Sequence, residues 1–434
     1  MRILHVTDCY LPRLGGIELQ VDDLASRQAD AGHEVTVLTT TAGVALSIPR
    51  LGDDPRADGC PPGLGGGAGG GRIRVVSAAR DRHPREKIMY RATRRGVRRL
   101  LDQLDDFDLV HVHASSFSPL VFLSAHHASR RGVPTVATVH SLWAKATPLF
   151  RGADLLAGWG DWPVVWSAVS NAAAAPLRSI LGGRAPVAIL PNGVEPDDWR
   201  VVHDGAGRGT PGEPRVLRVA VVSRLARRKR VVPLVEMLRA AHDRVPTGVM
   251  LDVRVLGEGP KRGELERYLK RHDMDGWVHL LGRRSRGDIR EVFSHSDLFV
   301  APASLESFGI AALEARCAGL PVLARSGTGV QDFVAHGVEG WLVDSDRAMI
   351  EAIVALAAGN ERLDLVADHN RTVPARISWK VVLDECEELY EQAAVGHGRC
   401  WQRAGSQPER TPGGHLQGVD AGARSGGSQH VPRR

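Results

Sequence analysis

Short apolar, β-branched runs alternate with amphipathic segments along most of this chain, and the alternation occurs in two series. Parallel strands are buried on both faces and need a crossover before the next strand, so this pattern predicts parallel sheets covered by helices. The first series predicts strands at residues 3–7, 34–39, 73–76, 109–113, 135–139, 164–169 and 187–190. The second series predicts strands at residues 218–223, 251–256, 278–281, 298–301, 321–324 and 341–343. The predicted fold class is α/β, with two facing doubly wound domains and a ligand cleft between them.

The expected domain limits follow from breaks in this pattern. A polar, Gly/Pro-rich stretch at 196–214 lies between the two series. We expect an N-terminal domain over residues 1–186 and a C-terminal domain over residues 187–375. Residues 52–71 are dense in Gly and Pro, which predicts a flexible surface insertion. Residues 396–434 are rich in Gly, Ser and Arg, which predicts a disordered basic tail.

The net charge of +6 is concentrated at the C-terminus, because the tail over 396–434 contributes +4 and the other 395 residues carry only +2. That balance argues against a nucleic acid as partner. The five cysteines lack metal or disulfide spacing, which fits a reducing compartment. No apolar run is long enough to span a membrane. We therefore expect a cytoplasmic protein.

Residues 306–314, Glu-Ser-Phe-Gly-Ile-Ala-Ala-Leu-Glu, follow a predicted strand and begin a predicted helix. Backbone N–H groups near a helix start favour anions, so the amides around Ser307, Phe308, Gly309 and Ile310 can bind phosphate. Ile310 and Glu314 share one helix face, which places a second carboxylate one turn behind those amides. Amides and carboxylates together suit a sugar joined to a nucleotide by a diphosphate. The alternative is an ordinary helix start, with Glu306 as a cap and Glu314 in solvent.

Basic side chains follow the strand at 218–223. Arg224 and Lys229 are five residues apart across a turn, so both can reach one diphosphate and stabilise the negative charge of a leaving group. Two such cations would make a divalent metal unnecessary, and we predict no metal site. The alternative is a solvated basic face, since residues 227–230 are all Arg or Lys. Two D-x-D triplets, at 106–108 and 344–346, look like loop residues rather than metal ligands.

Glycines and histidines mark the carboxyl ends of the N-terminal strands. Gly15 and Gly16 follow the first strand and allow either close approach to a ligand or a plain tight turn. His140 follows the strand at 135–139 and is either a cleft residue or a buried structural histidine. His111 and His113 share one strand face, but no third metal ligand is apparent. We treat these two as packed or cleft-lining residues.

Several segments in order resemble the retaining glycosyltransferases of family 4, which have two facing Rossmann-like domains in the GT-B architecture. The resemblance covers roughly residues 1–395. It is carried by Glu306 and Glu314 in an E-x7-E pattern and by further short segments, namely Gly15-Gly16, 138–140, 191–194, 223–225 with Lys229, 256–260 and 318–322. The family usually has Gly where this chain has Ser223 and Arg230. Residues 111–118 and 139–143 look like the branch that adds N-acetylglucosamine to phosphatidylinositol.

The resemblance implies a role for each matching residue. The donor would be a UDP- or GDP-linked sugar, used as substrate without a further cofactor. Catalysis would rest on four residues, namely His140, Glu306, Arg224 and Lys229. The donor would also contact Gly15, Gly16, Ser307, Phe308, Gly309, Ile310 and Glu314, with Arg283 bordering the base. His140 would bond a hydroxyl of the donor sugar, Glu306 would contact the transferring sugar, and Glu314 would hold the ribose. A final helix at 376–395 would complete the N-terminal, acceptor-binding domain.

A basic segment at 85–104 predicts an amphipathic helix with an Arg-rich face that includes Arg91, Arg94, Arg95 and Arg98. Such a helix can lie on an anionic membrane surface or bind a phosphorylated acceptor, and the alternative is a plain surface helix. The branch resemblance implies a small or lipid-linked hydroxyl acceptor that contains inositol. The protein would then be peripheral on the inner face of the membrane.

Two other functions compete with glycosyl transfer. A nucleotide-sugar 2-epimerase shares the two-domain architecture, and it alone would convert the donor without an acceptor. A catalytically inactive nucleotide-sugar-binding protein is the non-enzymatic alternative. The presence of Glu306, Glu314, Arg224, Lys229 and His140 argues against such a loss of catalysis.

Overall fold

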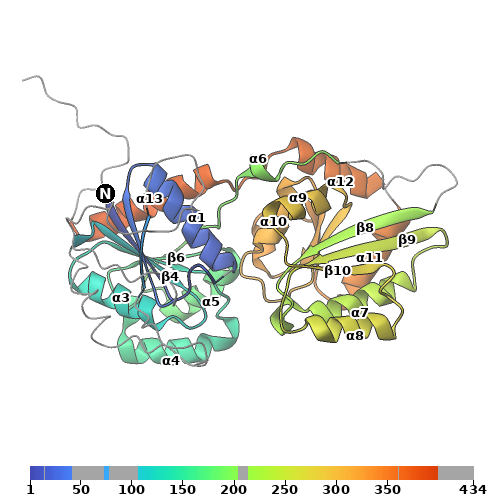
Figure 1. The fold of residues 1–434 in the computed structure, drawn as a ribbon. Helices are drawn as coiled ribbons and strands as arrows, with labels where there is room; N and C mark the ends of the chain where they lie inside the picture. The colour runs from blue at the N-terminus through green and yellow to red at the C-terminus, as the bar shows by residue number, and fades with distance from the viewer. Residues whose placement is uncertain (14, 42–72, 78–105, 204–213, 360, 399–434) are drawn as a thin grey trace, which may run out of the picture. The chain divides into compact units, whose positions relative to one another are not determined.

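The computed structural model describes residues 1–13, 15–41, 73–77, 106–203, 214–359 and 361–398. They form two parallel sheets with helices on both faces (Figure 1). The first sheet has the order β3-β2-β1-β4-β5-β6-β7. Its strands are β1 (Arg2–Thr7), β2 (Glu34–Thr39), β3 (Ile73–Ser77), β4 (Leu109–Ala114), β5 (Thr135–Val139), β6 (Val165–Ala168) and β7 (Val187–Ile189).

The second sheet has the order β10-β9-β8-β11-β12-β13. Its strands are β8 (Arg215–Val222), β9 (Val249–Leu256), β10 (Val278–Gly282), β11 (Leu298–Ala301), β12 (Val322–Arg325) and β13 (Gly340–Val343). In both sheets the first strand lies between the second and fourth, which is the doubly wound order. In each sheet the loops after the two central strands, β1 and β4 or β8 and β11, lead to opposite sides of the sheet. In this type of fold, ligands bind between such loops at the carboxyl edge. The predicted α/β class with two Rossmann-like halves is confirmed.

The main helices follow the strands in the same alternation. In the first half they are α1 (Gly16–Asp30), α3 (Pro119–Arg130), α4 (Thr147–Ala157) and α5 (Asn171–Leu181), with the short α6 (Pro196–Trp199) after β7. In the second half they are α7 (Val231–His242), α8 (Arg262–Arg271), α9 (Arg286–Ser294), α10 (Ile310–Cys317), α11 (Asp346–Ala358), α12 (Glu361–Thr372) and α13 (Trp379–Gly396). The central strands of the first sheet are buried because helices cover both faces; β4 and β5 are buried at every position, including their polar residues.

The boundary between the halves differs from the predicted one. β7 begins at Val187, beyond the predicted end of the first domain at residue 186, but it pairs in parallel with β6. The first sheet therefore extends to Ile189, because the apolar run at 187–190 completes its edge rather than starting the second sheet. The predicted basic helix at 85–104, the insertion at 52–71 and the tail beyond Gly398 lie outside the described residues.

The last helix, α13, belongs to the core of the first half. Ser378 caps it by accepting a hydrogen bond from the Val381 amide. Its apolar face packs on the first sheet, where Trp379, Leu389 and Tyr390 share a buried cluster with Ile3 and Val136. The chain thus returns from the second half to cover the first.

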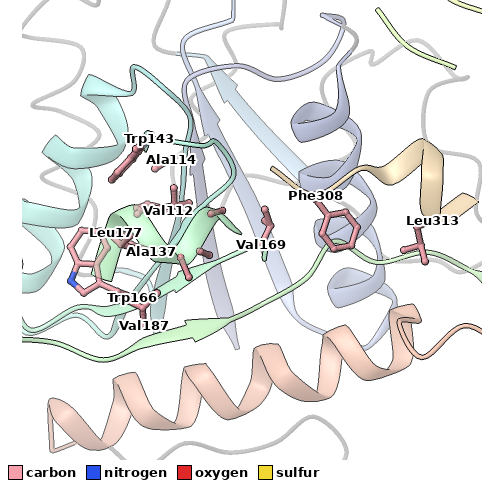
Figure 2. Close-up of a cluster of buried hydrophobic side chains, with 14 of the residues drawn as sticks. Val112, Ala114, Ala137, Trp143, Trp166, Val169, Leu177, Val187, Phe308 and Leu313 are labelled. Carbon is pink, nitrogen blue, oxygen red and sulfur yellow. The ribbon is translucent and has the colours of Figure 1, made fainter. Parts of the chain in front are cut away.

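Buried side chains from both halves form one apolar cluster. Figure 2 shows Trp143 and Trp166 of the first half, with Phe308 and Leu313 of the second half in the same cluster. Phe308 lies in the loop before α10, so the predicted phosphate-binding segment is anchored by its own apolar residue. Among the described residues, no helix is both long and apolar enough to cross a bilayer.

Candidate active site

The strongest polar contact at the carboxyl edge of the second sheet joins Lys229 to Glu306. Lys229 lies in the loop after β8, and Glu306 lies in the loop after the neighbouring strand β11. The Lys229 ammonium donates to a carboxylate oxygen of Glu306. Their side chains are 26% and 17% exposed, so the pair is accessible yet largely shielded from water. The structure therefore brings these two predicted residues together, with the ammonium held by the carboxylate.

Arg224 lies two residues after the end of β8, and its side chain is exposed. Its loop packs tightly on the loop at 256–260, where an added Cβ on Gly257 would lie 1.9 Å from the Ser223 carbonyl oxygen. An added Cβ on Gly259 would lie 2.3 Å from the Leu225 oxygen. The two glycines are thus required for the close approach of the loops. Within the described part of the chain, Arg224 forms no ion pair, so its guanidinium is available to a ligand.

The start of α10 is set by a glycine in the left-handed region. Gly309 has φ of 98°, and an added Cβ would lie 2.6 Å from Val330 Cγ2. The first helical bonds run from the amides of Ala312 and Leu313 to the Gly309 oxygen. The amides of Phe308, Gly309 and Ile310 precede these bonds, as the sequence predicted. The Ser307 carbonyl accepts a hydrogen bond from the Ser170 hydroxyl, which ties the loop to the N-cap of α5.

Glu314 lies one turn into α10 and is largely buried. Burial raises the pKa of Glu314 to about 8, although the nearby Arg286 guanidinium opposes the shift and Asp23 adds to it. Arg286 itself forms an ion pair with Asp23 at 2.9 Å. The predicted bidentate acceptance of ribose hydroxyls needs the ionised carboxylate, so burial makes this role dependent on pH.

The glycine pair after β1 lies against the start of α10. Gly15 is the N-cap of α1 in extended conformation, and an added Cβ there would lie 2.3 Å from Glu18 Oε2. An added Cβ on Gly16 would lie 3.3 Å from Ile310 Cδ1. The two loops predicted to contact the donor thus touch each other.

His140 follows β5 at the carboxyl edge of the first sheet and is 7% exposed. Burial lowers the pKa of His140 to about 4, with Asn192 opposing the shift. Its Nε2 lies 3.1 Å from His113 Nδ1. His140 also lines a cavity of about 20 Å³, together with Gln20, Asn192 and Trp379.

The sequence showed no third metal ligand beside His111 and His113, and the structure places one candidate there. His5 on β1 is the register partner of His111 on β4, and the ligand atoms of His5, His111 and His113 lie within 4.8 Å of one another. The signal was present in the sequence, since adjacent strands of a doubly wound sheet both carry histidines. Asp8 was also missed; it lies directly after β1, and one of its carboxylate oxygens accepts from the Leu120 amide at the start of α3 at 3.3 Å.

The remaining predicted residues lie elsewhere or act structurally. Arg283 is exposed beyond β10, the edge strand of the second sheet, and no described contact joins it to Glu306 or Lys229. Arg230 has φ of 55°, which explains why the family usually has glycine there. Its guanidinium binds Asp346, at 2.7 Å from Oδ1. Asp346 of the second D-x-D triplet therefore holds a loop, and Asp108 of the first accepts from the Arg2 amide at 2.8 Å.

Two family models match the chain. "Glycosyltransferase Family 4" matches residues 14–198, and "Glycosyl transferases group 1" matches residues 211–367. The chain is 25% identical over 407 residues to a component of the phosphatidylinositol N-acetylglucosaminyltransferase of Homo sapiens, covering 91% of this chain and 76% of that protein. It is 27% identical over 420 residues to D-inositol 3-phosphate glycosyltransferase 1 of Catenulispora acidiphila, covering 88% and 92%.

Solved structures have the same fold. The HepE protein of Anabaena in complex with UDP matches with a TM-score of 0.66 and 18% identity, covering 89% of this chain and 99% of HepE. The two doubly wound halves and the two family models define a glycosyltransferase of GT-B architecture. The chain belongs to glycosyltransferase family 4.

Proposed function

We propose that the protein transfers a sugar from a UDP- or GDP-linked nucleotide-diphospho-sugar to a hydroxyl acceptor, with retention of anomeric configuration and without a divalent metal. The observation that carries this proposal is the Lys229–Glu306 pair, which lies at the carboxyl edge of the second sheet in the loops of adjacent strands. An ammonium and a carboxylate at one point suit a donor whose diphosphate and sugar meet there.

The cations act on the leaving group. Negative charge grows on the diphosphate as the glycosidic bond breaks, and Lys229 and Arg224 stabilise it together with the amides before α10. When a donor binds, the diphosphate competes with Glu306 for the Lys229 ammonium. Glu306 then becomes free to accept hydrogen bonds from the sugar hydroxyls.

The nucleoside end lies on the α10 side of the site. Glu314 accepts hydrogen bonds from the ribose when ionised, and Arg286 stabilises that carboxylate electrostatically. His140 contacts a hydroxyl of the donor sugar from the first half. Gly15 and Gly16 let the loop after β1 approach the donor, since any larger residue would meet Glu18 or Ile310.

For the acceptor we propose an inositol-containing or lipid-linked hydroxyl. The names of two relatives support inositol chemistry, one acting with phosphatidylinositol and one with inositol 3-phosphate. A further support is the outer face of α4, where Leu149, Leu155 and Leu156 are 74%, 81% and 92% exposed. Exposed leucines beside the basic Lys145 suit the surface of an anionic membrane.

Vesicle flotation tests the membrane part of this proposal. Wild-type protein should float with anionic vesicles at low salt, and Leu155→Ser with Leu156→Ser should reduce the floated fraction. Leu365→Ser is a matched control, because Leu365 is 69% exposed on α12 of the second half. Absence of wild-type flotation at any salt concentration would remove the membrane surface as a partner.

Donor use is tested by incubating purified protein with UDP-, GDP- and ADP-sugars in EDTA, with and without inositol phosphate or phosphatidylinositol. Transfer in EDTA that requires an acceptor supports the proposal. Conversion of the donor sugar without acceptor would instead identify a 2-epimerase. Binding of a nucleotide-sugar without any turnover would identify an inactive binding protein.

A further inference from the structure

Seven polar side chains, with His140 attached at one end, form a continuous buried network inside the first half, and of these residues only His140 is part of the proposed donor site. The network joins β1, β4, β5 and β6 to helices α1 and α13 (Figure 1). Its members are His5, Gln28, His111, His113, Thr138, Ser167 and Tyr390, and His140 is attached at one end. All are at most 4% exposed, apart from His140 at 7%. A buried network of this size is costly unless every donor meets an acceptor.

One branch runs from Gln28 to His140. The His5 Nε2 atom lies 2.6 Å from the Gln28 carbonyl oxygen Oε1. His5 Nδ1 lies 2.9 Å from His113 Nε2, and His113 Nδ1 lies 3.1 Å from His140 Nε2. Each imidazole therefore uses one nitrogen towards Gln28 and the other towards the next residue in the branch.

The second branch starts from the other end of the same amide. The Gln28 Nε2 group donates to the Tyr390 hydroxyl at 2.9 Å. That hydroxyl lies 2.9 Å from His111 Nδ1, and His111 Nε2 lies 2.7 Å from the Thr138 hydroxyl. Thr138 in turn lies 2.7 Å from the Ser167 hydroxyl, which donates to the Ala137 carbonyl at 3.4 Å.

The four imidazoles are neutral at pH 7. Burial lowers the pKa of His5 and of His140 to about 4 each, and it lowers the pKa of His111 and His113 well below the ordinary value. A neutral imidazole carries one N–H donor and one bare acceptor nitrogen. In the branch from Gln28 to His140, which contains only imidazoles beyond the amide, the direction of every bond therefore follows from the direction of a single bond.

The Gln28 amide sets that direction. Because its carbonyl accepts, His5 must carry its proton on Nε2, and the bare His5 Nδ1 must accept from His113 Nε2. The bare His113 Nδ1 then accepts from His140 Nε2. In the second branch, the Tyr390 hydroxyl accepts from Gln28 and also interacts with Cys386, so the amide alone does not fix the direction of its bond to His111. We expect Tyr390 to donate to His111 Nδ1, which places the His111 proton on Nε2. This direction ends with Ser167 donating to the Ala137 carbonyl.

We propose that Gln28 is a positioning residue that fixes His140 as the Nε2–H tautomer, so that the bare His140 Nδ1 accepts a hydrogen bond from one hydroxyl group. Within the described residues His140 Nδ1 is buried and no hydrogen bond to it has a normal distance and angle, although the Asn192 side chain lies close enough to His140 to oppose the lowering of its pKa. The cavity that His140 lines, about 20 Å³, has room for about one hydroxyl or water. The assignment of that hydroxyl to the transferred sugar rests on the proposed function. The His140 tautomer does not depend on activity.

The tautomer is read directly by long-range ¹H–¹⁵N NMR of the full-length protein labelled with ¹⁵N-histidine, at pH 7 and without ligand. His140→Asn and His111→Asn assign the two end residues. We expect a bare Nδ1 and a protonated Nε2 at both. A proton on His140 Nδ1, an imidazolium, or a zinc-shifted signal that a chelator reverses would each overturn the proposal. The wild-type spectrum decides this even if every Gln28 variant fails to fold.

Two variants separate the branches. Gln28→Met removes both amide groups at similar volume, and we expect His140 to populate both tautomers. Tyr390→Phe removes the links of Tyr390 to His111 and to the Gln28 amide nitrogen, but it leaves the Gln28 oxygen at His5 Nε2, so the His140 signals should stay those of the Nε2–H form. Unchanged His140 signals in folded Gln28→Met would overturn the role of Gln28.

Activity then shows whether the hydroxyl belongs to the donor sugar. If half of the Gln28→Met molecules carry the wrong tautomer, donor kcat/KM falls about twofold, and it falls about tenfold if nine-tenths do. A series of deoxy donors should contain one for which wild type and Gln28→Met have equal kcat/KM. If Gln28→Met lowers kcat/KM by the same factor with every deoxy donor, the partner of His140 Nδ1 is water and the sugar assignment is overturned. Absence of any transfer would count against the proposed function and leave the NMR result unaffected.

Discussion

The two halves have the same strand order but opposite chemistry at their central strands. In the first half, β1 and β4 carry His5, His111 and His113, which are buried and neutral; His5 bonds to His113, and His111 bonds to Tyr390 and Thr138. In the second half, the loops after β8 and β11 carry Lys229 and Glu306, which are charged, paired and partly exposed. The doubly wound topology provides a carboxyl edge in both cases. The residue types at that edge decide whether it holds an anionic ligand or positions a single polar group.

The largest expected effect comes from removing a charge at the carboxyl edge of the second sheet. Lys229→Met or Glu306→Gln should lower sugar transfer about 100- to 1,000-fold, because each removes a group that stabilises or orients charge in the transition state. Steady-state kinetics with the best donor measures this. Lys380→Met is the matched control, since Lys380 also pairs with a carboxylate but is 84% exposed on α13. Near-normal turnover of either site variant would remove these residues from catalysis.

A substitution in the buried neutral network should change the free energy of unfolding, because it removes hydrogen bonds and no charge. His111→Phe removes one hydrogen-bond partner from each of the buried Tyr390 and Thr138 hydroxyls, so we expect a loss of about 2–4 kcal/mol in the free energy of unfolding. Urea denaturation measures this loss, which should vary little with salt. A change below about 0.5 kcal/mol would mean that the network contributes little to the fold.

Glu314 should make stability depend on pH. Its folded pKa of about 8 lies above the ordinary value of 4.5, so the native state holds a proton that the unfolded state has lost. The stabilisation that this proton contributes is therefore fully present below pH 4.5 and is lost as pH rises towards 8, by up to about 5 kcal/mol. Glu314→Gln should flatten this part of the urea-derived profile. An identical slope in wild type and variant would place the titration elsewhere.

Donor affinity should show the opposite trend with pH. Ribose hydroxyls bind the ionised Glu314, so the affinity for UDP or GDP should rise as pH approaches 8 and then level off. Isothermal titration at several pH values measures this, with Glu314→Gln as the variant that removes the trend. A flat wild-type profile would separate Glu314 from the nucleotide.

The smallest effect concerns the loop that carries Lys229. Arg230 is in the left-handed region, and its ion pair with Asp346 offsets that cost. Arg230→Gly removes both the strain and the pair, so stability should change by less than about 1 kcal/mol. Arg230→Ala keeps the strain and loses the pair, and it should be about 1 kcal/mol less stable than Arg230→Gly. Equal stabilities would show that the left-handed conformation costs little here.

Much of the fold could be predicted because fully buried strands are continuous apolar runs. Residues 34–39, 135–139 and 298–301 were predicted with the bounds that β2, β5 and β11 have. The expected domain limit at residue 186 lies before β7, although the apolar run at 187–190 belongs to the first series of predicted strands; the sequence alone does not show which sheet this short edge strand joins. Pairing with β6 decides that, and pairing is a tertiary property.

The sequence could predict those site residues that lie in the loop after a strand. Glu306, Lys229 and His140 all follow strands, and the sequence places them at carboxyl edges. The ion pair between Lys229 and Glu306 was not predicted, since it depends on β8 and β11 being neighbours. The histidine network was missed for the same reason: Gln28 and Tyr390 are 362 positions apart and meet only because α13 returns to the first half.

The most direct test is calorimetric binding of UDP and GDP in EDTA to wild-type protein and to Lys229→Met. We predict that wild type binds one of the two nucleotides without metal and that Lys229→Met binds it at least about tenfold more weakly, with Lys380→Met unchanged. Equal affinity in wild type and Lys229→Met, or binding that appears only after a divalent metal is added, would contradict the account.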